Sequence, residues 1–85
     1  MINIRDKLER KRRFQDVFST TNGRYVLMHV LRAGHVFEST FIRGDVNETL
    51  LREGERRMAL SILKQVAKDD DDALKMMQEL HENTV

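Results

Sequence analysis

The longest helical pattern in the chain runs from Val46 to Val66. Apolar side chains recur along it at three- and four-residue spacings, which places them on one face of a helix. A second apolar stripe begins halfway along the segment and lies on the opposite side. The first stripe comprises Leu50, Leu51, Met58, Ile62 and Val66, and the second comprises Ala59, Leu60, Leu63 and Ala67. Because a helix that is apolar on two sides needs cover from two directions, we expect this segment to be the central helix.

Gly54 interrupts the central helix on its first stripe. Glycine in a helix interior costs roughly 1 kcal/mol relative to alanine, so its presence needs a structural reason. We expect the missing side chain to let the preceding helix, or the loop that carries Phe37 and Phe41, approach closely. Replacing Gly54 by leucine would then destabilise the fold by overpacking.

Two amphipathic helices are predicted before the central one. Within residues 3–19 the apolar side chains fall on about half of a helical wheel. They are Ile4, Leu8, Phe14, Val17 and Phe18. Lys11 interrupts this stripe, so either its stem lies along apolar surface or the helix packs only from Phe14 onward and residues 1–13 form a basic arm. Short polar residues then cap a second helix over about residues 22–33, which ends at Gly34, the residue best able to adopt a left-handed C-cap.

Residues 34–45 lack helical periodicity but are too apolar for a free linker. We expect the rings of Phe37 and Phe41 to hold this segment over the core as an ordered loop, with a short extended piece at 37–42. Asp45 then begins the central helix as N-cap, with Glu48 three residues on in a capping-box arrangement.

Four consecutive aspartates at 69–72 precede a last amphipathic pattern. Negative side chains at a helix N-terminus are favoured by capping and by the helix dipole, so residues 69–85 are expected to form an acidic-capped C-terminal helix. The predicted fold class is therefore all-α. We expect residues 1–85 to form a small four-helix single domain with a long central third helix.

Composition narrows the classes of protein further. A chain of 85 residues has a thin core, and without cysteine it has neither a disulfide nor a thiolate metal site. We expect no membrane partner, because no long apolar run or signal peptide occurs. Charge is divided unevenly: residues 1–43 carry nine Lys and Arg against four Asp and Glu, whereas residues 44–85 carry six against ten. Such a dipole can steer the basic end to nucleic acid or align two copies head to tail.

No motif for catalysis, phosphate binding or cofactor binding occurs in the sequence. The three histidines, His29, His35 and His81, have no ligand spacing, and the aspartate run lacks the glycine and glutamate of a calcium loop. We therefore expect a protein that is not an enzyme, with no cofactor and no bound metal.

The basic run at residues 10–13 is the strongest chemical signal in the chain. Clustered cations can neutralise phosphates and release condensed counterions. The candidate nucleic-acid contacts are Arg5, Lys7, Arg10, Lys11, Arg12 and Arg13. Four consecutive residues point around most of a helix, however, so a solvated helix end is favoured over a nucleic-acid surface.

One set of residues resembles a known family. Those residues are Phe14, Val17, Phe18, Thr21-Asn22-Gly23-Arg24, Val26, Leu27, Leu31, Thr40-Phe41, Gly44-Asp45, Glu53-Gly54, Arg56-Arg57 and Ile62-Leu63. Together they span a core of residues 14–66 that is similar to a small domain family encoded among the structural genes of tailed bacteriophages, first defined on a Bordetella bacteriophage open reading frame. The resemblance implies a non-enzymatic virion-associated protein, made in the bacterial host cytoplasm. It also implies a location in the virion, either at the portal and head-to-tail region or among the internal proteins released with the genome.

We therefore predict a phage structural or interaction protein that acts by protein contacts and self-associates. Its candidate packing and partner-contact residues are Phe14, Phe18, Phe37, Phe41, Gly54, Leu60 and Leu63. Two alternatives remain open: an accessory protein that contacts DNA non-specifically through the basic run, and a phage factor that inhibits a host defence component.

Overall fold

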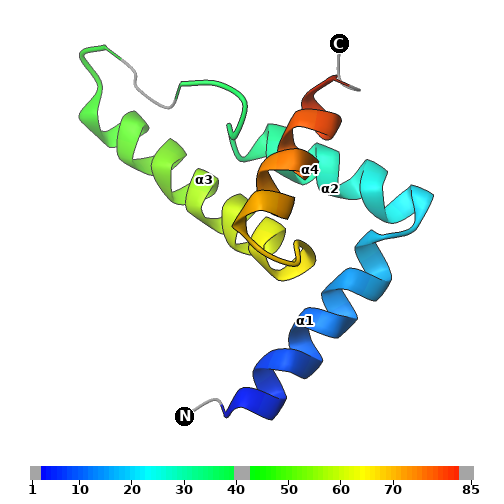
Figure 1. Cartoon of the computed structure of the whole chain (residues 1–85). Coiled ribbons are helices and arrows are strands. Elements are labelled where there is room, and N and C mark those ends of the chain that lie inside the picture. The colour runs from blue at the N-terminus through cyan, green and yellow to red at the C-terminus, as the bar shows by residue number, and fades with distance from the viewer. Residues whose placement is uncertain (1–2, 40–42, 83–85) are drawn as a thin grey trace.

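The computed structural model describes residues 3–39 and 43–82 of the chain, and these residues form four helices and no strand. The helices are α1 (Ile4–Phe18), α2 (Thr21–Ala33), α3 (Val46–Val66) and α4 (Asp70–Glu82) (Figure 1). The predicted all-α fold with a long third helix is confirmed. Of the loop between α2 and α3, residues 34–38 form turns and a bend, while Phe41 and most of the expected extended piece lie outside the described residues.

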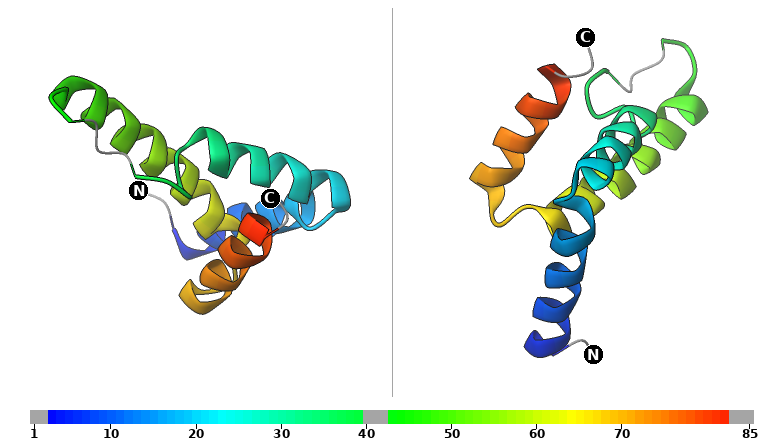
Figure 2. Two further views of the ribbon diagram at one scale, coloured as in Figure 1. Left: turned by 90° about the horizontal axis from the view of Figure 1, so that it is seen from above. Right: turned by 90° about the vertical axis from the view of Figure 1, so that its right-hand side faces the viewer.

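The helices meet at one end of α1 and one end of α3. Figure 1 and Figure 2 show α2 crossing the C-terminal half of α3, with α4 packed against both, while the N-terminal halves of α1 and α3 extend away from this junction. The molecule measures 45 × 37 × 21 Å, so its thinnest dimension equals about two helix diameters.

The buried core lies where α2, α4 and the second half of α3 meet. It consists of Leu27, Leu31, Val36, Ala59, Leu63, Val66, Ala67, Met76 and Leu80. The second predicted stripe of α3 therefore faces the core, together with Val66 from the first. For Leu50, Leu51 and Met58 of the first stripe the expected cover is wrong, because the other helices gather on one side of α3. Leu50, Leu51 and Met58 are exposed and Ile62 is half-buried.

A tight corner joins α1 to α2. The Thr20 side chain accepts a hydrogen bond of 2.9 Å from the backbone N–H of Gly23, which caps α2. A Cβ at Gly23 would lie 2.1 Å from the carbonyl oxygen of Val17 and 2.6 Å from the Cα of Phe18. Only glycine fits at this position, so the direction of α1 relative to α2 depends on it.

The end of α2 differs from the sequence prediction. Gly34 has φ −85° and is not left-handed, whereas the next residue, His35, has φ +60°. Gly34 is required for space instead: a Cβ there would lie 2.4 Å from the Cβ of Ala59 and 3.1 Å from the carbonyl oxygen of Glu55. The close approach expected at Gly54 occurs at Gly34. Gly54 is exposed, and no described atom lies within 4 Å of the position its Cβ would take.

Aspartates begin α3 and α4 as predicted. The Asp45 side chain accepts from the N–H of Glu48 at 2.9 Å, and the Asp69 side chain accepts from the N–H of Asp72 at 2.8 Å. Asp72 in turn accepts from the N–H of Lys68 at 2.8 Å. The acidic run thus supplies reciprocal hydrogen bonds around the start of α4.

No helix among the described residues has the length and apolar character needed to cross a membrane.

Candidate functional site

The N-terminal half of α1 lies away from the core. No described residue of this helix is buried, and only its C-terminal end reaches the core, through the half-buried rings of Phe14 and Phe18. These two rings stack with centroids 6.1 Å apart. Ile4 and Leu8, by contrast, are 76% and 62% exposed. The sequence left open whether this helix packs only from Phe14 onward, with residues 1–13 as a basic arm. That alternative is confirmed in part: the helix packs against the core from Phe14 onward, but the preceding arm is helical from Ile4.

The basic residues of this arm serve different purposes. Arg12 and Arg13 both bind Glu9, with nitrogen–oxygen distances of 2.9 Å. Hydrogen bonds from Arg13 and Arg12 hold the pKa of Glu9 below its usual value. Lys11 donates from Nζ to the carbonyl oxygen of Lys64 at 3.0 Å, at the negative end of the α3 dipole.

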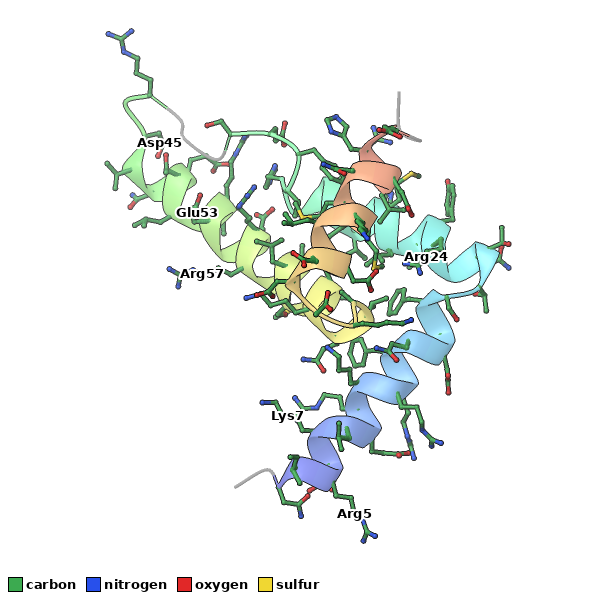
Figure 3. All side chains as sticks on the ribbon, viewed as in Figure 1. Arg5, Lys7, Arg24, Asp45, Glu53 and Arg57 are labelled. Carbon is green, nitrogen blue, oxygen red and sulfur yellow. The ribbon has the colours of Figure 1, made fainter. Side chains whose placement is uncertain are left out.

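Of the six basic residues in the α1 arm, the other three are available to an external anion. Arg5, Lys7 and Arg10 make no ion pair with the described part of the chain. Figure 3 shows Arg5 and Lys7 near the free end of α1, pointing in different directions. The structure therefore does not gather the six candidate contacts on one surface.

The N-terminal half of α3 forms a second exposed region. Val46, Leu50 and Leu51 in this half are 58–73% exposed, and Met58, just beyond it, is 66% exposed, although all four are large apolar residues. Leu60 is half-buried against the core, and Leu63 is 1% exposed, so Leu63 is unavailable to a partner.

A network of polar side chains joins α3 to the turn after α2. Arg56 donates from one guanidinium nitrogen to the carbonyl oxygens of His35 and Val36, at 3.1 and 3.0 Å. The His35 ring lies between two carboxylates, with Nδ1 2.6 Å from Glu38 and Nε2 3.0 Å from Glu55. The hydrogen bond with Glu38 raises the pKa of His35, aided by Glu55 and opposed by partial burial, and the same bond lowers the pKa of Glu38. These contacts hold the left-handed turn against α3.

The remaining histidines line a shallow pocket between α2 and α4. Phe37 from the loop stacks on His81 of α4, with ring centroids 4.9 Å apart and an angle of 18° between the rings. The pocket has a volume of about 470 Å³ and is lined by His29, Arg32, Ala33, Phe37, Glu38 and His81. Within the described residues, no group of three or more potential ligands is placed to hold a metal ion. Phe37 thus contacts α4 through His81.

The chain has more surface than a compact monomer of its size. Its accessible surface is 6710 Å², whereas a folded monomer of 10.0 kDa typically has about 5,200 Å². The radius of gyration is 14.2 Å, against about 12 Å for a compact domain of this length. The N-terminal halves of α1 and α3, which extend away from the junction of the helices, are the two arms of this extended shape (Figure 1).

Sequence reasoning missed the network around His35 and the pairing of Lys11 with α3. His35 and Glu55 are 20 positions apart and Lys11 and Lys64 are 53 apart, so no local spacing connects them. The only sequence signal near the network was the Glu-Gly-x-Arg-Arg segment at 53–57, which supplies Glu55 and Arg56.

Comparison with known proteins identifies one family. The model of the Bbp19-like phage proteins matches residues 14–79, which runs past Val66 and includes most of α4. No significant match was found among the curated proteins or the solved structures. The residues before position 14, which include most of the exposed arm of α1, lie outside the match.

Proposed function

Because the chain belongs to the Bbp19-like phage protein family, we propose that it is a virion-associated protein that acts by protein–protein contacts. The portal and head-to-tail region, or the set of internal proteins released with the genome, is its proposed place in the particle. The observation that carries the proposal is the accessible surface of the chain, roughly 1,500 Å² more than that of a compact monomer, together with the large apolar side chains exposed on α1 and on α3.

This surplus has the size and character of partner surfaces. A specific interface buries about 800 Å² on each partner, so the surplus corresponds to roughly two such footprints. Large apolar side chains lie exposed on both arms, including Ile4 and Leu8 on α1 and Leu50 and Leu51 on α3. Exposed apolar residues gathered in this way usually mark contacts with other proteins. The α1 arm is the surface proposed to dock on a different virion protein.

The experiment that tests the proposal is mass spectrometry of purified particles from a phage that encodes this chain. We expect the protein in the particle, and we expect the double variant Ile4→Ser, Leu8→Ser to be produced and folded but lost from it. Leu74→Ser is the matched control, because Leu74 is 59% exposed on α4, away from both arms. Absence of the parent protein from the particle would refute the proposal and leave the inhibitor of host defence as the better hypothesis.

A DNA-contacting role is the second candidate, and it is favoured by the exposed arm with Arg5, Lys7 and Arg10. Since Arg12 and Arg13 share Glu9 and Lys11 binds α3, we expect only weak, non-specific binding that falls steeply as salt rises. Fluorescence anisotropy with a DNA duplex would measure it, comparing the parent with the variant in which Arg5, Lys7 and Arg10 are serine. Tight or sequence-selective binding by the parent would place this role first.

A further inference from the structure

A small pocket opens where residues of all four helices come together, and we call it the corner pocket. Its volume is about 260 Å³, and it is lined by Gln15, Ser19, Arg24, Val66, Lys68 and Asp72. Val66 is buried, whereas the other five residues are polar or charged. All six lie within residues 14–79, the part of the chain that the family model matches. The candidate nucleic-acid contacts of the α1 arm, by contrast, precede that match.

Arg24 is the residue of the corner pocket whose situation most needs an explanation. It is half-buried in the first turns of α2. Its guanidinium nevertheless makes neither an ion pair nor a hydrogen bond with the described residues. Charged groups that are withdrawn from water are usually paired, because losing hydration without a partner costs free energy. A guanidinium in this position indicates an anion that comes from outside the chain.

The corner pocket holds three further donors besides Arg24. Lys68, in the connection between α3 and α4, is exposed, and its ammonium group forms no ion pair within the described ranges. Gln15 is half-buried, and its side-chain amide makes no hydrogen bond to the described residues either. The Ser19 hydroxyl is 3.4 Å from the carbonyl oxygen of Asp16, a long contact that it can exchange for a better acceptor.

Asp72 contributes the negative charge of the lining but does not neutralise the two cations. Its Oδ2 accepts from the backbone N–H of Lys68 at 2.8 Å, which ties the carboxylate to the start of α4. Among the described residues it forms no ion pair with Arg24 or with the ammonium of Lys68. Two cations against one carboxylate leave the corner pocket with a net positive charge.

We propose that the corner pocket binds a phosphate group, held by Arg24 and Lys68 with Gln15 and Ser19 as further donors. A planar guanidinium can donate two parallel hydrogen bonds to two phosphate oxygens, and an ammonium group can reach a third. A tetrahedral phosphate thus uses more of these donors than the two oxygens of a carboxylate. The proposal does not depend on the proposed function.

The size of the corner pocket limits what else the ligand can contain. Sites for drug-sized molecules have volumes of about 300–1,000 Å³, and the corner pocket is smaller. It therefore suits one phosphate group and the atoms next to it. Such a group can come from a free phosphate ion or from the backbone of a nucleic acid that lies across the pocket.

The test is a titration of the purified, ¹⁵N-labelled full chain with sodium phosphate at constant ionic strength, followed by NMR. We expect saturable shifts of the side-chain signals of Arg24 and Gln15, with a Kd of about 1 mM. Arg24→Gln should weaken binding at least about tenfold, because it removes the charge-assisted pair of hydrogen bonds. Lys68→Gln should also weaken it. Arg57→Gln is the matched control, since Arg57 is exposed on α3 and directed away from the body of the molecule (Figure 3).

Melting temperatures separate loss of binding from loss of folding. Without phosphate, Arg24→Gln should melt no lower than the parent, because it removes a half-buried charge that has no partner in the described part of the chain. Phosphate should raise the melting temperature of the parent and of Arg57→Gln by binding to the folded state. Its general salting effect acts on all variants, so the smaller rise expected for Arg24→Gln measures the site.

A DNA duplex and sodium acetate identify the source and the chemistry of the ligand. If the nucleic-acid backbone is the source, Arg24→Gln weakens duplex binding as well as phosphate binding. If free phosphate is the source, Arg24→Gln weakens phosphate binding alone, and both results support the site. The proposal is overturned by acetate that binds as tightly as phosphate, or by the absence of a saturable shift. An Arg24→Gln variant that binds phosphate like the parent, or Arg57→Gln that weakens binding equally, also overturns it.

Discussion

Replacing Gly34 by alanine tests the close approach between the end of α2 and α3. The new Cβ would lie 2.4 Å from the Cβ of Ala59 and 3.1 Å from the carbonyl oxygen of Glu55. Two carbon atoms attract best at about 3.5–4.0 Å, so α2 and α3 must separate by about 1 Å or more. The backbone itself allows alanine, since φ is −85° at this position. The effect is therefore steric.

The expected loss of stability is about 1–3 kcal/mol, the usual result of overpacking a close contact. Alanine also reduces the entropy of the unfolded chain, which offsets up to about 1 kcal/mol of this loss of stability. For a domain of this size each kcal/mol lowers the melting temperature by about 4–8 °C. Thermal unfolding followed by circular dichroism at 222 nm, a wavelength sensitive to helix content, provides the measurement, with urea unfolding as a check on two-state behaviour.

A double-mutant cycle tests whether the contact between side chains at positions 34 and 59 causes the loss of stability. Ala59→Gly alone should destabilise, because it places glycine inside α3 and removes a buried methyl group. Gly34→Ala combined with Ala59→Gly removes the 2.4 Å contact, so we expect the double variant to be more stable than the sum of the single effects by 0.5 kcal/mol or more. Strictly additive effects, or a Gly34→Ala variant as stable as the parent, would refute the close contact.

Two further predictions concern the caps and the charged network. Asp69→Ala removes the acceptor for the N–H of Asp72 and should cost about 0.5–2 kcal/mol in thermal unfolding, whereas Asp69→Asn keeps the acceptor and should cost much less. The pKa of His35 is raised above 6.5 and that of Glu38 is lowered below 4.5. Their ion pair therefore stabilises the fold fully between pH 4.5 and pH 6.5. Melting temperatures should fall as pH rises through the raised pKa of His35, or drops through the lowered pKa of Glu38, and this dependence should flatten in His35→Asn, which tolerates the left-handed backbone. An unchanged pH profile in that variant would contradict the role of the network.

The helices could be predicted because their signals are local. Each of α2, α3 and α4 begins at a short polar side chain that accepts from an amide three residues ahead: Thr20, Asp45 and Asp69. The amphipathic pattern of α2 and α4 then identifies their buried sides. These features depend on positions within one or two turns, which is the range over which a sequence pattern carries information.

The buried side of α3 could not be predicted, because its helical wheel has two apolar stripes. Which stripe faces the core depends on where the other helices lie, and that is determined by corners such as the one at Gly23. The same limit applies to the two glycines: Gly34 and Gly54 both sit on helix surfaces, but only the crossing of α2 and α3 shows which one is at a contact. Of the candidate nucleic-acid contacts, Lys11 turned out to bind the end of α3, 53 positions away.

The corner at Gly23 also bears on how the α1 arm would bind a partner. A disordered extension loses conformational entropy when it becomes ordered on binding, and this weakens its affinity. Here the arm is already helical, it leaves the body at an angle fixed by a corner that accepts only glycine, and Lys11 ties it to α3 through a hydrogen bond of 3.0 Å. The exposed side chains of Ile4 and Leu8 are thus preorganised. A partner that bound them would meet a helix that is already formed, so the backbone entropy of forming that helix would not be lost on binding.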